Sequence, residues 1–217
     1  ITAHHFGDGA TEILLVGGVH GGYSPNTSEL AEALIGYYEN NETQIPEGIT
    51  LTIIPNLNPD GTTRSGTEGR FNANDVDLNR NFDCKWAPES TWRGQVVSAG
   101  TEPFSEPEAA ALRDLVTELQ PEGVVFWHSQ ANNVYASECE DGVLPETLAL
   151  MNTYALAGNY GAVPSFDAYP ITGDAEGWLA SLGIPAVTVE LESFRSIEWT
   201  RNLAGTMAVI ADYSYAK

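Results

Sequence analysis

The chain has 217 residues, 42% of them apolar, and a formal charge of −21 from 30 acidic and 9 basic residues. This length and composition fit one domain with a single large core, so we expect one domain over residues 1–217. The scarcity of basic residues argues against nucleic-acid and anionic-membrane partners. The sequence contains no run of 18 apolar residues, the length that a membrane-spanning helix needs.

Apolar strands alternate with helical stretches along the chain, which predicts an α/β fold. We expect a mixed, mostly parallel, twisted sheet with helices on both faces. The first predicted helix has Thr27 or Ser28 as its cap. In chain order we predict a strand at 13–19, a helix at 28–38, a strand at 49–54, a helix at 106–119, a strand at 123–127, helices at 146–158 and 174–182, a strand at 185–191 and a helix at 199–213.

The stretch 56–101 is rich in Gly, Asn, Asp and Pro and has little periodicity. Such a long irregular stretch inside a compact domain is usually functional. It contains Asn79-Arg80-Asn81, and a planar guanidinium beside amide donors matches the two oxygens of a carboxylate. The alternative is a structural arginine paired with a nearby aspartate.

Three polar residues follow apolar runs at the ends of predicted strands, where open α/β sheets place their ligands. They are His20, His128 and Glu190. Two imidazoles and a carboxylate around one crevice are the components of a metal hydrolase.

These residues, with Pro55-Asn56-Leu57-Asn58-Pro59-Asp60-Gly61 and Asp77-Leu78-Asn79-Arg80-Asn81-Phe82, resemble the zinc metallocarboxypeptidases of the M14 or funnelin type, in particular compact bacterial members. The resemblance covers roughly residues 13–203. It implies a zinc carboxypeptidase-like fold, Zn²⁺ as cofactor, and a peptide substrate with a free C-terminal carboxylate.

The resemblance also implies a role for each matching side chain. His20 and His128 would bind zinc, and Glu190 would act as general base. The substrate would be held by the remaining matches: Asn79 and Arg80 at its terminal carboxylate, Arg70 at the scissile carbonyl, and Tyr169 closing over its last residue.

The chain departs from the family pattern after His20. The motif His-x-x-Glu expects a carboxylate at Tyr23, or at Ser24 if the turn is one residue longer, and we take Ser24 as the candidate third metal position. Phenol and hydroxyl are poor zinc ligands. Three alternatives stay open: Glu29 reaches back from the first helix, metal binds weakly through two histidines, or the chain is a catalytically impaired module that binds C-terminal carboxylates.

Residues after Tyr169 line the terminal-residue pocket in this family, and here they include Asp174 and Glu176. Carboxylates there would select a basic terminal residue, or the amine of diaminopimelate in a cell-wall peptide. The alternative is that Asp174 caps a helix and Glu176 lies in its first turn.

A zinc-dependent deacylase of small N-acyl amino acids is a further alternative to the carboxypeptidase activity, because Asn79 and Arg80 would suit its substrates too.

The two cysteines, Cys84 and Cys139, lie far apart in polar surroundings. A secreted or periplasmic protein would pair them, and we expect such a location and a disulfide. The alternative is two unrelated buried thiols.

Overall fold

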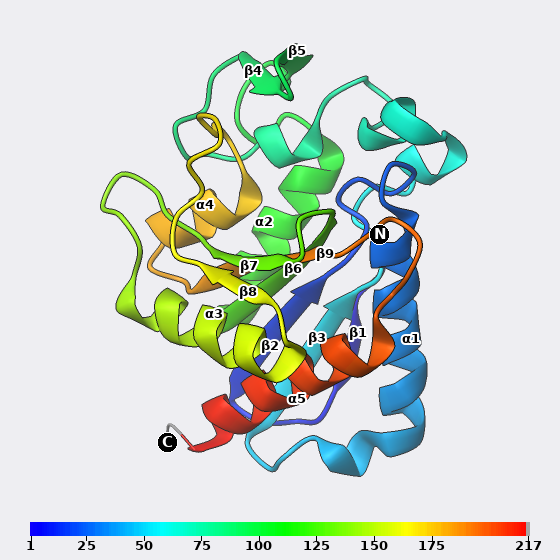
Figure 1. Ribbon diagram of the computed structural model, residues 1–217, viewed down its shortest axis with the longest axis vertical. Coiled ribbons are helices and arrows are strands. Elements are labelled where there is room, and N and C mark those ends of the chain that lie inside the picture. The colour runs from blue at the N-terminus through cyan, green and yellow to red at the C-terminus, as the bar shows by residue number, and fades with distance from the viewer. Residues whose placement is uncertain (216–217) are drawn as a thin grey trace.

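The structure, a computed structural model, describes residues 1–215 and has a seven-stranded sheet at its centre (Figure 1). The strands are ordered β1 (His4–Phe6), β3 (Ile49–Ile54), β2 (Thr11–Val16), β6 (Gly123–Ser129), β9 (Ala186–Leu191), β7 (Asn133–Ala136) and β8 (Gly161–Val163). The inner strands β3, β2, β6 and β9 are parallel, whereas β1 and β7 run antiparallel to β3 and β9. The prediction of a mixed, mostly parallel sheet is confirmed.

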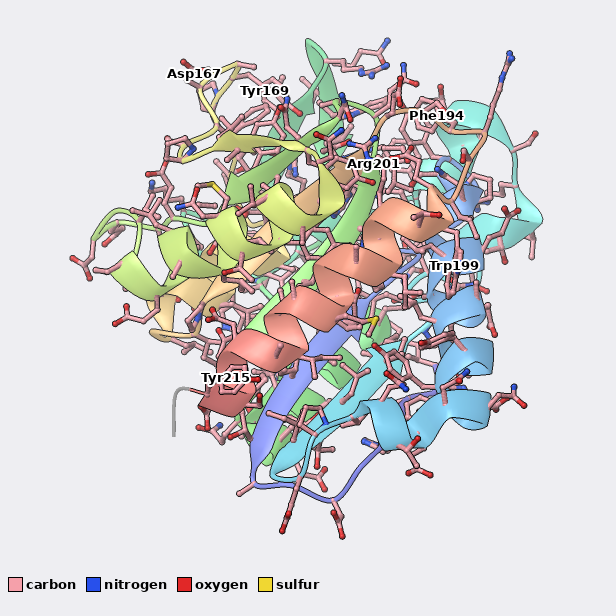
Figure 2. The ribbon with its side chains drawn as sticks, turned by 60° about the horizontal axis from the view of Figure 1, so that its bottom comes forward. Asp167, Tyr169, Phe194, Trp199, Arg201 and Tyr215 are labelled. Atoms are coloured by element: carbon pink, nitrogen blue, oxygen red, sulfur yellow. A yellow bond between two sulfur atoms is a disulfide. The ribbon has the colours of Figure 1, made fainter. Side chains whose placement is uncertain are left out.

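Helices cover both faces of the sheet because the side chains of its buried strands point alternately to opposite sides. Leu15 and Trp127 belong to a core cluster with residues of α1 (Pro25–Asn41), α3 (Pro145–Gly158) and α5 (Trp199–Tyr215). Leu14 and Phe126 pack instead with residues of α2 (Pro107–Leu119) and α4 (Ala175–Ser181). Figure 1 shows α3 beside α5 in front of the sheet, and Figure 2 labels Trp199 and Tyr215 near the two ends of α5.

The first helix begins earlier than predicted. Ser24 is its N-cap residue and Pro25 is its first residue, so the prediction of a cap at Thr27 or Ser28 was wrong. The physical reason is Pro25, whose fixed φ suits the first helical position and whose missing N–H costs no hydrogen bond there.

Several short elements escaped prediction, namely β1, β7, β8 and the hairpin of β4 (Glu89–Trp92) and β5 (Gln95–Ser98). Each has three or four residues, too few for a clear alternation. The hairpin forms a separate two-stranded sheet within the irregular stretch, which also holds 3-10 turns at Gly61–Thr63, Gly66–Arg70 and Leu78–Arg80. Another 3-10 turn, Glu42–Gln44, follows α1.

Cys84 and Cys139 form a disulfide with a Cα–Cα distance of 6.1 Å, as expected from the sequence. The bridge connects the segment after Leu78–Arg80 to the segment after β7. Within residues 1–215, no helix combines the length and apolar character needed to cross a membrane.

Candidate functional site

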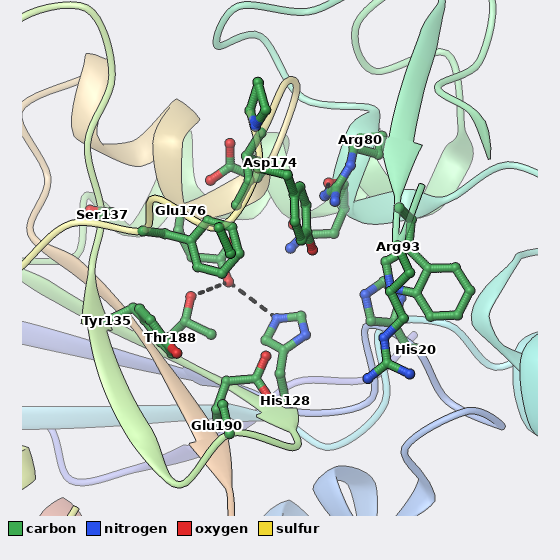
Figure 3. A pocket seen from close by; sticks show the side chains of 18 of the residues that line it. His20, Arg80, Arg93, His128, Tyr135, Ser137, Asp174, Glu176, Thr188 and Glu190 are labelled. Atoms are coloured by element: carbon green, nitrogen blue, oxygen red, sulfur yellow. Dashed lines mark hydrogen bonds and ion pairs between the residues drawn. The ribbon is translucent and has the colours of Figure 1, made fainter. Parts of the chain in front are cut away.

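A cavity of about 500 Å³ opens at the carboxyl ends of the central parallel strands. Its lining includes His20, His128 and Glu190 (Figure 3). His128 and Glu190 are the next-to-last residues of β6 and β9, whereas His20 lies in a turn four residues after β2, which ends at Val16 and not at the predicted residue 19. Strand pairing explains part of this arrangement, because His128 on β6 lies directly opposite Glu190 on β9. Parallel strands therefore bring polar residues from distant parts of the sequence to one edge of the sheet.

The two histidines are buried, and their ring centroids are 5.2 Å apart. Nδ1 of His20 lies 3.4 Å from the backbone oxygen of Arg70 and 3.9 Å from Oδ1 of Asp77. Burial, aided by the positive charge of Arg70, holds the pKa of His20 well below its usual range. His20 is therefore a neutral imidazole near pH 7.

His128 is bound to the carboxylate of Glu176, with 3.2 Å between Nε2 and Oε1. The same Oε1 accepts a hydrogen bond of 2.9 Å from the hydroxyl of Thr188 (Figure 3). Burial by itself lowers the pKa of His128, but the hydrogen bond and charge of Glu176 outweigh it and raise the pKa. Burial by itself raises the pKa of Glu176, but the hydrogen bond and charge of His128 outweigh it, so the pKa of Glu176 is lowered. The pair thus favours an imidazolium beside a carboxylate.

Glu190 has a carboxylate oxygen, Oε2, that is buried and has no hydrogen-bond partner within the described chain. Burial raises the pKa of Glu190, and the positive charges of His128 and Arg70 oppose this rise. A carboxyl group with a raised pKa accepts and holds a proton closer to neutral pH than an exposed glutamate does.

Arg70 is held on two sides. Its Nε donates a 2.7 Å hydrogen bond to Oδ2 of the buried Asp77, and its Cζ lies 4.5 Å from the ring centroid of Trp92. Trp92 ends β4, so the hairpin contributes directly to the site. Arg70 thus has a fixed orientation on the cavity wall.

Asn79 and Arg80 lie in a 3-10 turn whose N-cap residue, Asp77, accepts a hydrogen bond from the N–H of Asn79 through its side chain. Oδ1 of Asn79 accepts a 2.9 Å hydrogen bond from the N–H of Ala175, which leaves the amide donor of Asn79 for a ligand. The guanidinium of Arg80 is buried, donates to the backbone oxygen of Asn79, and has an Nε without a partner among the described residues. Both residues line the cavity.

Asp174 and Glu176 also line the cavity, close to Arg80 (Figure 3). The helix-cap interpretation of Asp174 is correct too, because its Oδ2 accepts a 2.8 Å hydrogen bond from the N–H of Gly177. Burial and the charge of Glu176 raise the pKa of Asp174 to about 6. Gly173, at φ +68°, allows this approach: a Cβ there would lie 2.2 Å from the backbone oxygen of Arg80.

Tyr169 lines the cavity from the loop between β8 and α4, where Figure 2 labels it near Asp167. Its ring centroid lies 4.9 Å from that of Phe166, in an edge-on contact. The predicted closing tyrosine is thus at the cavity wall.

The position expected to hold a third metal ligand contains no carboxylate. The Ser24 hydroxyl donates to the backbone oxygen of His20, and Ser24 is not among the residues that line the cavity. Tyr23 does line it, with its ring against Trp92, whereas Glu29 is exposed on α1 and does not. Among residues 1–215, no three His, Cys, Asp or Glu side chains are arranged to hold a metal ion. These residues therefore do not by themselves fit a three-ligand zinc site.

Sequence reasoning missed several cavity residues, including Trp92, Arg93 and Thr188. A signal for Arg93 was available, because a basic residue in a chain this acidic is unusual enough to examine. Thr188 and its bond to Glu176 carried no such signal.

The mostly parallel sheet brings two histidines and a buried glutamate to one crevice, an arrangement typical of hydrolases. The zinc carboxypeptidase family model matches residues 3–197, and the chain belongs to this family. Murein peptide amidase A of Escherichia coli K12 is 29% identical over 205 residues, which cover 90% of this chain and 77% of that protein.

Two further similarities agree with the family. Gamma-D-glutamyl-L-diamino acid endopeptidase 1 of Lysinibacillus sphaericus is 25% identical over 171 residues, or 66% of this chain and 42% of that protein. The crystal structure of murein-tripeptide amidase from Escherichia coli O157 has a TM-score of 0.71 at 23% identity and covers 96% of this chain and 90% of that one. The predicted fold and family are confirmed.

Proposed function

We propose that this chain is a carboxypeptidase-type hydrolase of peptides that end in a free carboxylate and whose last residue carries a basic side chain. Lysine, arginine and diaminopimelate have this chemistry. The observation that carries the proposal is a cavity with two unlike groups at one end: the cationic Arg80 with Asn79, and the acidic Asp174 with Glu176.

The C-terminal residue of such a substrate has two charges, a negative carboxylate and a positive side chain, and this end of the cavity has groups of opposite charge for both. A guanidinium and an amide donor hold a carboxylate through several parallel hydrogen bonds. Asp174 lies close enough to both Arg80 and Glu176 for their charges to affect its pKa. An amine placed between the two carboxylates would relieve their repulsion, which supports a basic or diaminopimelate-type residue.

The bond-breaking step uses residues deeper in the cavity. Arg70 would polarise the scissile carbonyl and stabilise the oxyanion, a contribution typically worth about 100- to 1000-fold in rate. Glu190, with its raised pKa, would take a proton from the attacking water and pass it to the leaving amine. Asn79 and Arg80 would fix the carboxylate so that the carbonyl lies against Arg70.

The test compares acetyl-Ala-Lys with its C-terminal amide. We expect the free acid to bind at least about 30-fold more tightly, because an unpaired charge facing a buried arginine costs about 2 kcal/mol or more. Mass spectrometry of the released lysine measures turnover, and an Arg80→Gln variant should lose the preference for the acid. Equal binding or cleavage of the amide would remove the carboxypeptidase assignment. Acetyl-Lys tests the deacylase rival in the same assay.

A second candidate function is recognition of C-terminal carboxylates with little catalysis. The observation in its favour is that Tyr23 and Ser24 provide no carboxylate ligand, while His128 is engaged by Glu176. Tight binding of the acid without release of lysine would favour this function.

We also propose secretion or export to the periplasm, since the disulfide would persist in such an oxidising compartment. Fractionation of the source cells tests this location.

A further inference from the structure

Basic side chains are concentrated around the cavity. The whole chain has 9 Lys and Arg residues against 30 Asp and Glu. Four of the nine line this one cavity: Arg70, Arg80, Lys85 and Arg93. The same lining holds four of the 30 acidic residues, Glu138, Asp174, Glu176 and Glu190, so basic residues make up half of its charged side chains, a far larger share than in the chain as a whole. This relative enrichment makes the cavity less repulsive to anionic ligands than the rest of the surface. One terminal carboxylate accounts for Arg80 alone.

Arg93 is a cavity residue that the proposed function does not use. It is exposed at the turn between β4 and β5, and in residues 1–215 no carboxylate lies within ion-pair distance of its guanidinium. Its Cζ lies 5.5 Å from the ring centroid of Trp92. Four of the other arginines pair with a carboxylate, such as Arg64 with Asp75 at 2.7 Å and Arg113 with Asp114 at 2.8 Å, whereas Arg80 and Arg195 have no such partner among the described residues.

Trp92 connects Arg93 to the reacting centre, because its ring also lies against Arg70, 4.5 Å from Cζ. The charge of Arg93 reaches Glu190 as well and contributes to lowering its pKa against the effect of burial. Figure 3 shows Arg93 across the cavity from Glu176. Arg93 is therefore on the side of Arg70 and Glu190, where the scissile carbonyl would lie. It is away from the acidic wall, formed by Asp174 and Glu176, that would hold the terminal side chain.

We propose that Arg93, supported by Trp92, binds a second carboxylate of the substrate, carried by the residue on the amino side of the scissile bond. This inference rests on the proposed function, because Arg80 must hold the terminal carboxylate for the direction of the substrate to be set. The chemistry fits two sources: the side chain of a glutamate in an ordinary peptide, or the α-carboxylate of a glutamate linked through its γ-carboxyl.

The test measures binding by isothermal titration calorimetry in EDTA, which suppresses metal-dependent turnover. The ligands are acetyl-Glu-Lys, acetyl-γ-Glu-Lys and the neutral reference acetyl-Gln-Lys. The variants are Arg93→Gln and, as a control outside the cavity, Arg113→Gln on α2. We expect the unaltered chain to bind at least one of the glutamyl peptides about three- to fivefold more tightly than the reference, the range of an exposed ion pair.

The preference should disappear in Arg93→Gln and remain in Arg113→Gln, while the affinity for acetyl-Gln-Lys stays the same in all three proteins. The glutamyl peptide that shows the larger preference identifies the linkage. Binding of the three peptides with equal affinity to the unaltered chain, or a preference that survives in Arg93→Gln, overturns this inference and leaves the proposed function standing. Failure of all three peptides to bind the unaltered chain overturns both.

Discussion

The disulfide should contribute strongly to stability, and its contribution can be worked from the loop that it closes. Cys84 and Cys139 are 55 residues apart in the sequence. In the chain-entropy model, cross-linking a loop of that length lowers the entropy of the unfolded state by an amount worth about 4 kcal/mol at 25 °C. That is a large part of the roughly 5–15 kcal/mol by which domains are usually stable.

The perturbation is the double variant Cys84→Ser/Cys139→Ser, which removes the bridge without leaving a free thiol. Urea unfolding followed by circular dichroism gives the free energy of unfolding from the midpoint and slope. We expect a loss of about 4 kcal/mol, and the unaltered chain treated with a reductant should behave like the variant. A loss below about 1 kcal/mol would refute the reasoning, since the unfolded chain would then not be the state that the bridge restricts.

The bridge should also affect the cavity, because the backbone oxygen of Cys84 accepts a 2.7 Å hydrogen bond from the N–H of Gly173. Gly173 directly precedes Asp174, so movement at Cys84 would reach the acidic wall. The double variant should therefore bind acetyl-Ala-Lys more weakly at a urea concentration where both proteins remain folded. Unchanged affinity would mean that the bridge acts on stability alone.

Two further predictions concern charge and metal. Asp174 must lose its proton to attract a terminal amine, so the affinity for acetyl-Ala-Lys should rise about fivefold as the pH rises through about 6. Titrations at pH 5 and 7 should show this rise in affinity. The rise should be absent in the Asp174→Asn variant and for a peptide that ends in norleucine. The same rise in the variant would contradict the proposal that Asp174 attracts the terminal amine. Separately, elemental analysis after dialysis should find well under one zinc per chain in the unaltered protein and about one in Tyr23→Glu or Ser24→Glu, whichever places a carboxylate beside His20. About one zinc in the unaltered chain would show that a third ligand exists elsewhere.

The sequence predicted the candidate site best where a side chain lies at the end of a strand, because the strand pairing then determines the position of that side chain. His128 and Glu190 each follow an apolar run, and parallel pairing of those runs leaves little freedom in where the side chains meet. The same holds for the proposed carboxylate-binding pair, because Asn79 and Arg80 lie in a short turn capped by Asp77 from within the same segment.

What the sequence did not reveal depends on contacts between distant segments. The bond between Glu176 and His128 joins residues 48 positions apart, and no local pattern distinguishes a pocket glutamate from one engaged with an imidazole. Trp92 and Arg93 belong to a hairpin of four-residue strands, in which the alternation is too brief to be recognised.

The hairpin Glu89–Ser98 lies outside the seven-stranded sheet, and a single bridge between Ser98 and Val76 is its backbone pairing to another segment among the described residues. Trp92 and Arg93, which we propose act on the amino side of the scissile bond, thus come from a segment that is not a strand of the central sheet. Its exposed turn, with Arg93 and Gly94, can change without altering the strand pairing that aligns His128 with Glu190, provided that Trp92 still packs against Arg70. A chain built in this way can acquire a new preference for one half of its substrate while retaining the other, and grafting hairpins between family members is a direct route to altered selectivity.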